Sequence, residues 1–231
     1  MIYAGYILLT MLGLRFCVVL VNFFSRSFLP VRKTKGAEPL VSVLIPARNE
    51  EQHLPLILSD LQGCGYSNIE VIVCNDHSSD GTEEVLAFYK NNFPALSYFN
   101  GAGLSEGWLG KNFACYQLAQ RASGDFFLYF DADVRIKPGA IRRMVTYSMK
   151  HQLALLSIFP QQIIESEGEW KTVPLMNWIL LSFLPLPLAR WRRFSSLSAA
   201  NGQVMLFESQ IYRQRQWHEM VKNKNVEDIA I

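Results

Sequence analysis

The sequence is poor in the residues that mark several common classes of protein. It has only four cysteines, and no two of them form a CxxC pair. This spacing predicts reduced structural thiols, as in a cytosolic domain, and neither a disulfide framework nor a zinc site. The four histidines are scattered, without an HExxH motif. The net charge is only +2, and no block of Lys and Arg interleaves with aromatic residues, so we predict no nucleic-acid partner.

Charged residues are also scarce, at 18% against 50% hydrophobic residues, and they are scarcest at the start of the chain. Residues 2–24 contain a single charge, on Arg15. A helix of this length reaches about 34 Å, which is enough to cross a bilayer core of about 30 Å. The arginine would cost about 2.5–3.5 kcal/mol there unless it snorkels or pairs with another helix. Residues 1–25 are therefore predicted to be a transmembrane anchor.

A cleaved signal peptide is the alternative for this segment. A signal peptide needs a basic start, a shorter apolar run and a small-residue cleavage site. The chain starts without Lys or Arg and shows no A-x-A pattern, which favours a retained anchor. Residues 26–40 form a predicted basic linker with Pro and Gly, and by the positive-inside rule they hold the rest of the chain in the cytoplasm. The basic residues of the linker are Arg26, Arg32, Lys33 and Lys35.

After the linker, short apolar runs alternate with stretches of helical spacing. The runs are continuously apolar, which is typical of strands buried on both sides of a sheet. Their alternation with helices predicts an α/β fold, Rossmann-like, with a mostly parallel central sheet and helices on both faces. The predicted strands are residues 41–47, 69–76, 96–100, 125–133 and 153–160, and the predicted helices are residues 50–62, 78–90, 111–122 and 138–151.

A second apolar stretch, residues 174–189, is interrupted by Pro185 and Pro187. It is too short and too broken to cross a membrane comfortably. Aromatic and basic residues flank it, which is typical of a segment that lies in the membrane interface, so residues 168–193 are predicted to be such a segment. A buried helix of the domain is the alternative. The flanking or interrupting residues are Trp170, Trp178, Trp191, Arg190, Arg192 and Arg193.

Three of the predicted strands end in polar residues. Residues 46–50 follow the first strand, residues 75–78 follow the second, and residues 131–133 follow the strand that begins at residue 125. Ligands bind beyond the carboxyl ends of the strands in an open parallel sheet. The three endings together predict a ligand site at this edge, because a single polar ending is common in any surface loop.

The last of these endings contains two aspartates, Asp131 and Asp133. In an extended strand, residues i and i+2 point the same way, so these carboxylates would face one space. Such a pair repels unless a cation lies between them, and carboxylate oxygens suit Mg²⁺ or Mn²⁺. Paired carboxylates of glycoside hydrolases are the alternative, but those lie on opposite sides of a sugar. No P-loop and no GxGxxG motif is present, and Lys111 falls at a predicted helix start that favours an anion.

The three polar endings lie within longer motifs that resemble those of the family 2 inverting glycosyltransferases. The motifs are VSVLIPARNEE, VIVCNDHSSDGTEE and GWLGKNFACYQLAQRASGDFFLYFDADV, in the order that the family shows. The resemblance implies a GT-A fold over residues 41–231 and a hexosyltransferase-type activity. GWLGKN and the N-terminal anchor are most similar to membrane-bound members with carotenoid or other lipid acceptors. It also implies a bacterial cell membrane, with the catalytic domain facing the cytoplasm.

The resemblance further implies a role for each matching residue. Asp76 would hydrogen-bond the nucleotide base, typically uracil, and Lys111 would approach the diphosphate or ribose. Asp131 and Asp133 would hold the metal ion, Mg²⁺ or Mn²⁺, with Asp131 also near the nucleotide. Residues 200–203 resemble the acceptor-side loop. The residues that would border the nucleotide are Pro46, Ala47, Arg48 and Glu50.

The implied mechanism is a single displacement with inversion. Asp228, of the Glu227–Asp228 pair, would remove a proton from the hydroxyl of a lipid acceptor, which attacks the sugar of a nucleotide-diphosphate sugar. Asn75 stands where many members have an aspartate, and it adds no charge. Members usually continue beyond Ile231, so the resemblance implies a C-terminally truncated chain. The alternatives are a truncated, non-catalytic nucleotide-sugar-binding membrane protein and a metal-dependent nucleotidyl or phosphoryl transferase.

Overall fold

The computed structural model describes residues 2–25, 29, 38–164, 166–189 and 201–224. The chain forms two compact units. The helical unit consists of residues 1–28 and 161–199, and the sheet unit consists of residues 29–160 and 200–231. The helical unit is thus built partly from an excursion that leaves and re-enters the sheet unit along the chain.

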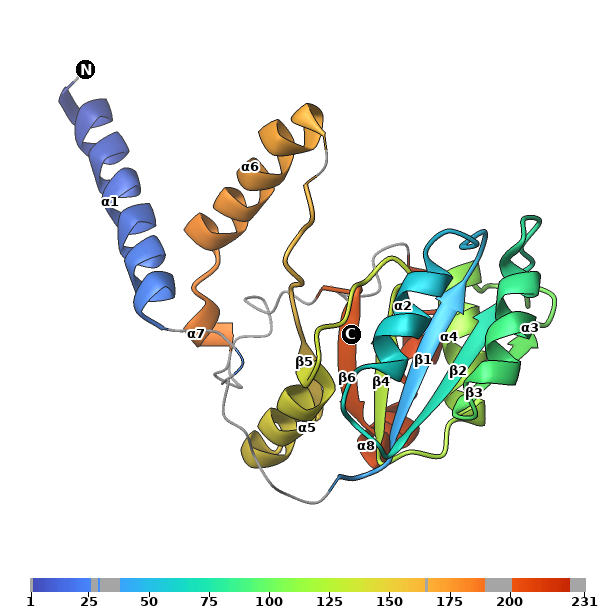
Figure 1. The fold of residues 1–231 in the computed structure, drawn as a ribbon. Helices are drawn as coiled ribbons and strands as arrows, with labels where there is room; N and C mark the ends of the chain where they lie inside the picture. The colour runs from blue at the N-terminus through green and yellow to red at the C-terminus, as the bar shows by residue number, and fades with distance from the viewer. Residues whose placement is uncertain (1, 26–28, 30–37, 165, 190–200, 225–231) are drawn as a thin grey trace. The chain divides into compact units, whose positions relative to one another are not determined.

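The sheet unit contains a six-stranded sheet in the order β3-β2-β1-β4-β6-β5 (Figure 1). The four strands β1 to β4 pair in parallel, whereas β6 runs antiparallel to both β4 and β5. The structure therefore confirms the predicted α/β fold with a mostly parallel sheet. The strands are β1 (Val41–Ala47), β2 (Ile69–Asn75), β3 (Leu96–Asn100), β4 (Phe126–Phe130), β5 (Leu155–Ser157) and β6 (Val204–Glu208).

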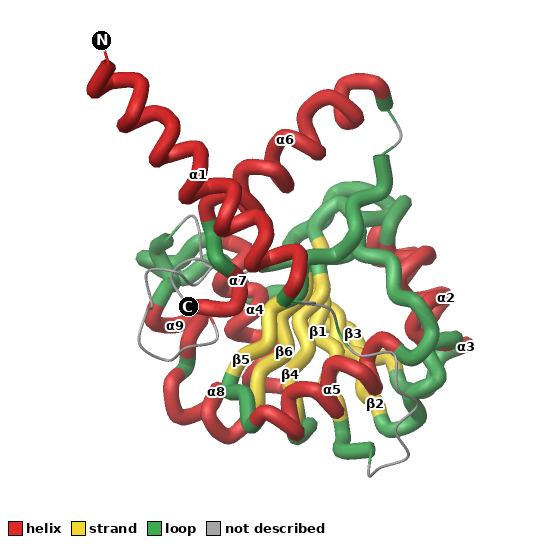
Figure 2. Tube along the Cα trace, turned by 90° about the vertical axis from the view of Figure 1, so that its left-hand side faces the viewer, coloured by secondary structure: helices red, strands yellow, loops and turns green. Residues whose placement is uncertain are grey.

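Helices cover both faces of the sheet, as Figure 2 shows. Alternate residues of each strand point to opposite faces, so every central strand contributes to two cores. In β4, Phe127 and Tyr129 pack toward the first group of helices, whereas Leu128 packs toward the second. The first group is α4 (Gly110–Arg121), α8 (Ser209–Arg215) and α9 (Trp217–Met220). The second group is α2 (Leu54–Gln62), α3 (Thr82–Asn92) and α5 (Ala140–His151).

The structure corrects several predicted boundaries. The strand predicted over residues 125–133 ends at Phe130, because residues 131–133 form a turn in which the Val134 N–H donates to the Asp131 carbonyl at 3.2 Å. The predicted strand at residues 153–160 is formed only over Leu155–Ser157, and the helix predicted from residue 50 begins at Leu54. Strand β6 and the short helices after it were not predicted.

The helical unit contains α1 (Ile2–Phe24), α6 (Glu167–Phe183) and α7 (Leu186–Ala189). Helix α1 is long and apolar enough to cross a membrane, and no residue of it is buried within the protein. Helix α6 ends just before Pro185, and α7 begins after it. Most of the predicted linker, and Trp191 with its neighbouring arginines, lie outside the described residues.

Candidate functional site

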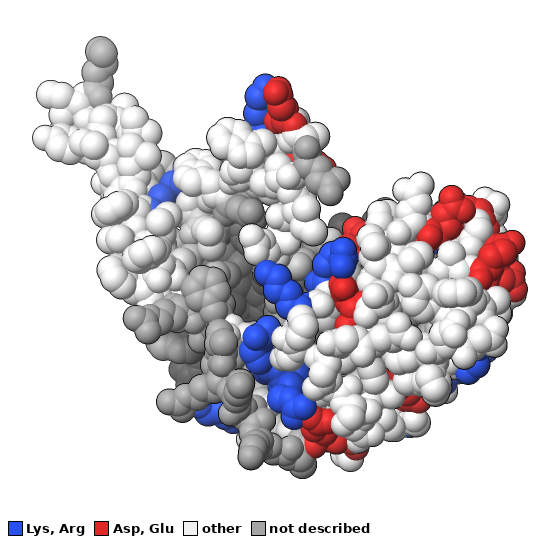
Figure 3. Space-filling view, viewed as in Figure 1, with Lys and Arg blue, Asp and Glu red and all other residues white. Residues whose placement is uncertain are grey.

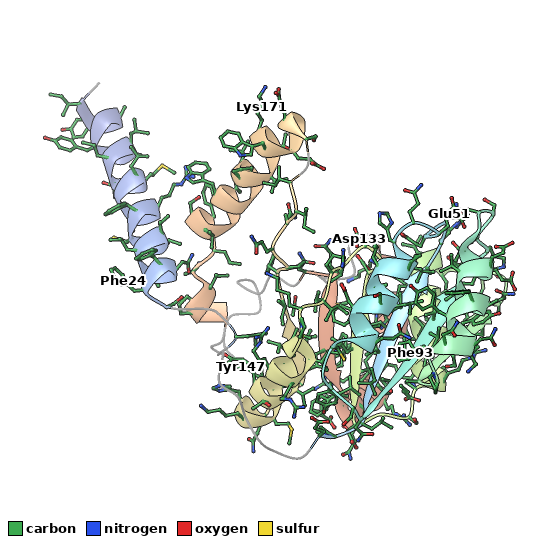
Figure 4. The ribbon with its side chains drawn as sticks, viewed as in Figure 1. Phe24, Glu51, Phe93, Asp133, Tyr147 and Lys171 are labelled. Atoms are coloured by element: carbon green, nitrogen blue, oxygen red, sulfur yellow. The ribbon has the colours of Figure 1, made fainter. Side chains whose placement is uncertain are left out.

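The carboxyl ends of β1, β2 and β4 meet at one edge of the sheet, because these strands are parallel neighbours. Figure 4 shows Asp133 and Glu51 at this edge. A cavity of about 400 Å³ opens there, and the structure places around it all eight residues predicted to bind the nucleotide or the metal ion. Asp228 lies outside the described residues. The lining residues are Pro46, Ala47, Arg48, Glu50, Asp76, Gly110, Lys111, Ala114, Asp131, Ala132 and Asp133.

The loops after β1 and β2 hold each other in place at the rim of this cavity. The Asp76 N–H donates to the Ala47 carbonyl at 2.7 Å. Asn49 adopts a left-handed backbone with φ of 58°, and its side-chain oxygen accepts from the Ser79 N–H at 2.8 Å. Its own N–H donates to the Ser78 hydroxyl at 2.9 Å. These bonds fix two of the four segments that surround the cavity.

Asn75, the position where many family members carry an aspartate, is buried and supports the rim from below. Its amide nitrogen donates to the Asn100 side-chain oxygen at 2.9 Å, and its own oxygen accepts from the Ser78 N–H at 3.3 Å. An uncharged side chain suits this place, because it serves both bonds without burying a carboxylate. Gly110 allows the start of α4 to lie close to Asp76, since a Cβ at position 110 would lie 3.3 Å from the Asp76 carboxylate.

Lys111 and the acidic pair meet inside the cavity. The Lys111 ammonium lies 2.8 Å from the Asp131 carboxylate, with 45% and 26% of the two side chains exposed. The turn places Asp131 and Asp133 on the same cavity, although the strand geometry that predicted this is wrong. Four carboxylates and two basic side chains line the cavity, which gives it a formal charge of −2.

A divalent cation fits these residues by charge and by ligand type. The described residues contain no group of three or more His, Cys, Asp or Glu side chains that could enclose a metal ion. Two carboxylates at an open cavity instead match the habit of Mg²⁺ and Mn²⁺, which take one or two protein carboxylates and complete their shell with substrate phosphates and water. Asp131 and Asp133 would supply those carboxylates.

The acceptor-side loop predicted at residues 200–203 touches the acidic turn. The Asp131 N–H donates to the Gln203 carbonyl at 3.0 Å. Asn201 holds the loop in shape, because its side-chain oxygen accepts from the Gln203 N–H at 2.8 Å and its N–H donates to the Ser157 hydroxyl at 2.6 Å. The described part of this loop, residues 201–203, is therefore hydrogen-bonded both to β5 and to the turn at residues 131–133.

The chain segment that leads toward Asp228 is fixed on the start of α4. The Leu109 N–H donates to the Lys222 carbonyl at 2.8 Å. The buried Asn112 amide nitrogen donates to the Val221 carbonyl at 2.9 Å and to the Lys224 carbonyl at 3.2 Å. The same turn of helix thus presents Lys111 to the cavity and holds the last described residues. The sequence prediction missed this role of Asn112, although the GWLGKN motif contains it.

A buried polar cluster links residues of α4, β4, α8 and α9. His218 is fully buried, and its Nδ1 lies 2.6 Å from the Tyr212 hydroxyl. That hydroxyl lies 3.1 Å from the Tyr129 hydroxyl, which donates to the Cys115 carbonyl at 3.1 Å. Burial raises the pKa of both tyrosines. Burial, and then the positive charge of Lys111, lowers the pKa of His218 to about 3.

This cluster predicts a loss of stability in acid. The unfolded chain binds a proton on His218 below its ordinary pKa of about 6.5, whereas the folded chain does so only near pH 3. The histidine therefore contributes stability that is complete above about pH 6.5 and falls by up to about 1.4 kcal/mol per pH unit toward the folded pKa. When the pH is lowered from 7 to 5, the free energy of unfolding should decrease in both proteins. The decrease should be smaller in His218→Gln than in the parent, by about 2 kcal/mol.

Urea titrations at the two pH values measure this difference. His151→Gln is the control, since His151 is an exposed histidine at the end of α5. The prediction is wrong if the parent and His218→Gln lose equal stability on acidification.

The structure is a GT-A-like α/β domain with a cavity at the carboxyl ends of its parallel strands. The family model Glycosyl transferase family 2 matches residues 42–214, so the chain belongs to glycosyl transferase family 2. This confirms the resemblance given by the three sequence motifs.

Curated relatives and solved structures agree with this assignment. The chain is 29% identical over 169 residues to the 4,4'-diaponeurosporenoate glycosyltransferase of Staphylococcus haemolyticus, which covers 72% of this chain and 42% of that protein. It is 26% identical over 141 residues to the beta-monoglucosyldiacylglycerol synthase of Trichormus variabilis, covering 60% of this chain and 30% of that protein. The chain thus spans less than half the length of these relatives.

Two solved structures share the fold. The mannosyltransferase PcManGT from Pyrobaculum calidifontis, in complex with GDP-Man and Mn2+, matches 96% of this chain and 60% of its own with a TM-score of 0.64 at 15% identity. TarS of S. aureus in complex with UDP-GlcNAc matches 82% of this chain and 52% of its own with a TM-score of 0.53 at 16% identity. At these identities the likeness establishes the fold alone.

Proposed function

We propose that the protein is a membrane-anchored hexosyltransferase. It transfers a sugar from a nucleotide-diphosphate sugar, a UDP-sugar, to a lipid-like acceptor of polyprenyl or carotenoid type, with inversion. The observation that carries the proposal is the gathering of eight predicted donor-site residues, from four separate segments, around one cavity. Names of relatives with carotenoid and diacylglycerol acceptors support the lipid class.

The charge of the cavity supports a metal-dependent donor site. A diphosphate would meet a cavity of formal charge −2, and the repulsion would oppose binding unless a cation came with it. Asp131 and Asp133 would hold Mg²⁺ or Mn²⁺, which when bound would offset the charge that develops on the departing diphosphate. A neighbour with the same fold is named as a complex with GDP-Man and Mn2+.

The residues of the chain divide the remaining tasks. The rim formed by residues 46–50 and by Asp76 would bind and orient the nucleoside. Lys111 would move from Asp131 toward the diphosphate when the donor enters. Asp228 would take the proton of the acceptor hydroxyl, whose oxygen then forms the new bond to the anomeric carbon as the bond to the diphosphate breaks.

Helix α1 would keep this domain at the membrane where a lipid acceptor lies. Its length and apolar surface suit a retained span, and the basic residues after it would place the sheet unit on the cytoplasmic side of a bacterial cell membrane.

The proposal is tested by turnover of the chain reconstituted in lipid vesicles. Radiolabelled UDP-sugar should yield labelled lipid and free UDP only when an acceptor lipid is present, and Asp228→Asn should lower the rate by about 100-fold or more. Equal UDP release by the parent and Asp228→Asn would favour the alternative of a non-catalytic nucleotide-sugar-binding protein.

A further inference from the structure

Charge is distributed unevenly along the sheet unit. Residues 49–89 contain eight acidic residues and no Lys or Arg, whereas residues 134–160 contain five Lys or Arg and no acidic residue. The whole chain has a net charge of only +2, so the two segments depart from the average in opposite directions. The acidic residues are Glu50, Glu51, Asp60, Glu70, Asp76, Asp80, Glu83 and Glu84, and the basic residues are Arg135, Lys137, Arg142, Arg143 and Lys150.

The fold places these two segments at opposite ends of the sheet. The acidic segment runs from the end of β1 through α2 and β2 into α3, whereas the basic segment forms α5 and β5. In the strand order β3-β2-β1-β4-β6-β5, β5 is the edge strand farthest from β2 and β3. Figure 3 shows acidic side chains gathered around α3 and basic side chains nearer α5, and in Figure 4 Glu51 and Tyr147 lie toward these two ends. The sheet unit therefore has an acidic end and a basic end.

Helix α5 turns a basic and aromatic face outward. Arg143, Tyr147 and Lys150 follow the i, i+4, i+7 spacing that places three side chains on one face of a helix. Met149 is 49% exposed beside them, and the His151 ring packs on that of Tyr147 with their centres 4.4 Å apart. Basic side chains next to aromatic and apolar ones suit the headgroup region of a bilayer. The opposite side of the helix is buried and consists of Ile141, Met144, Val145 and Ser148.

The basic residues at the centre of this face are not neutralised by the described part of the chain. No described carboxylate forms an ion pair with Arg143 or Lys150, in contrast to two arginines at the margins of the basic end. Those two pairs are Arg135 with Asp60 and Arg142 with Glu38. An anionic phospholipid surface supplies the negative charge that Arg143 and Lys150 lack, and each Lys or Arg near such a surface strengthens binding about fivefold.

We propose that the basic end of the sheet unit, centred on α5, docks on the anionic phospholipid surface of the membrane. The acidic end is repelled by the same surface and turns toward the solvent. A membrane is favoured over a soluble polyanion because α1 tethers the chain to a bilayer, which makes docking intramolecular, so that a few charges suffice. The inference rests on the membrane anchoring by α1 in the proposed function, and it is independent of catalysis.

Docking at this end gives the two sides of the cavity different surroundings. Of the three strands that end at the cavity, β4 is the one nearest to β5 in the sheet, with only β6 between them. Asp131 and Asp133 follow β4, whereas Asp76 follows β2. The acidic pair therefore lies on the membrane side of the cavity and Asp76 on the solvent side, so that a lipid acceptor and a soluble donor reach the cavity from different directions.

Headgroup quenching of a fluorescent dye tests which end of the sheet unit meets the membrane. The dye is attached in a Cys17→Ala background to Met149→Cys on α5, or to Phe88→Cys on α3 as the matched exposed position at the acidic end; the other three cysteines are buried. The full chain is reconstituted in phosphatidylcholine–phosphatidylglycerol vesicles with nitroxides on the headgroups. Quenching at position 149 should exceed quenching at position 88 at least about threefold, because only the basic end is drawn to anionic headgroups.

The same measurement shows whether charge drives the docking. The difference between the two positions should disappear in vesicles of phosphatidylcholine alone. It should also disappear in about 1 M NaCl, where the Debye length falls to about 3 Å.

Neutralising the face of α5 should release the sheet unit from the membrane. Arg143→Gln combined with Lys150→Gln should lower the ratio of docked to undocked sheet unit about 25-fold, at about fivefold for each basic residue. Quenching at position 149 should then fall to its level in phosphatidylcholine alone. Arg215→Gln combined with Lys222→Gln is the matched control, since it removes the same charge from exposed residues of the segment that packs on the other face of the sheet. It should leave the quenching of the parent unchanged.

Several results would overturn the inference. Equal quenching at positions 149 and 88, or quenching at position 149 that persists without anionic lipid and in high salt, would exclude docking by charge. Equal losses in the two double variants would show that net charge, and not α5, draws the sheet unit to the membrane. Protection of position 149 from both the nitroxides and aqueous iodide would mean that protein, such as a second copy of the chain, covers α5.

Flotation of the chain with the vesicles separates docking from anchoring. The parent and all variants should float, because α1 is unchanged apart from Cys17→Ala. Failure of the parent to float would remove the anchoring by α1 and the inference with it. No turnover is measured, so failure of docking in a chain that floats is separate from failure of the proposed enzyme.

Discussion

Asp133→Asn is expected to lower sugar transfer at least about 100-fold, because it removes one carboxylate of the pair that would hold the metal ion beside the departing diphosphate. The side chain is exposed in the turn after β4, where the substitution leaves the buried neighbours Ala132 and Val134 in place. The fold should therefore survive, and the loss should appear in donor binding and turnover.

Thermal melting separates the metal-dependent part of donor binding. At 100 times its dissociation constant, a ligand stabilises the native state by about 2.7 kcal/mol, which corresponds to about 5–10 °C for a chain of this size. UDP with Mn²⁺ should raise the melting temperature of the parent by this amount. In Asp133→Asn the shift should be no larger with Mn²⁺ than without it.

Glu84→Gln serves as the control, since Glu84 is an exposed carboxylate in the first turn of α3, away from the cavity-lining residues. It should keep both the thermal shift and the activity of the parent. A parent shift that is the same with and without Mn²⁺, or an equal shift in Asp133→Asn, would remove the acidic pair from the donor site.

Gly124→Ala is expected to give the largest loss of stability among small substitutions in the sheet unit. A Cβ at this position would lie 2.6 Å from the Ser42 hydroxyl, 2.7 Å from the Ser42 nitrogen and 2.8 Å from the Leu40 carbonyl. Two of these three atoms are backbone, so β1 and β4 would have to move apart where they first pair. The Gly124 N–H bond to the Ser42 hydroxyl, at 2.8 Å, would be strained as well.

The free energy of unfolding should fall by about 3 kcal/mol, from overpacking together with a weakened buried hydrogen bond. Urea titration measures it as a lower midpoint with an unchanged slope. Gly103→Ala is the matched control, because no atom lies within 4 Å of a Cβ at that position. A loss at Gly124 no greater than at Gly103 would mean that the two strands separate easily at this point.

The sequence was most informative where chemistry and topology coincide. The apolar runs that became β1, β2 and β4 end in polar residues, and parallel pairing necessarily brings such endings to one edge. The polar strand ends therefore predicted the edge of the sheet at which Asp76 and Asp131 line the cavity, and the predicted helix start placed Lys111 there as well. The argument from strand alternation was wrong in detail, since Asp131 and Asp133 lie in a turn and still reach the same cavity.

The features that were missed depend on contacts between residues far apart in the chain. Strand β6 pairs antiparallel with β4, so the pattern of parallel strands alternating with helices did not predict it. Asn112 and Asn22 are single polar residues in helices, and only the folded chain shows that they serve the backbone of residues 221–224 and 181–186. No local pattern distinguishes them from ordinary solvated side chains.

The position of the excursion between β5 and β6 has a consequence for how such a protein can diversify. The two strands are neighbours that pair antiparallel, from Leu155 opposite Phe207 to Ser157 opposite Met205, and Ser157 and Asn201 bond to each other where the chain leaves and returns. These hydrogen bonds hold together the two points where the chain leaves and re-enters the sheet unit. The sheet can therefore form whatever segment lies between them. Residues 161–199 can therefore change in length and sequence while the sheet and the cavity at its edge keep their structure.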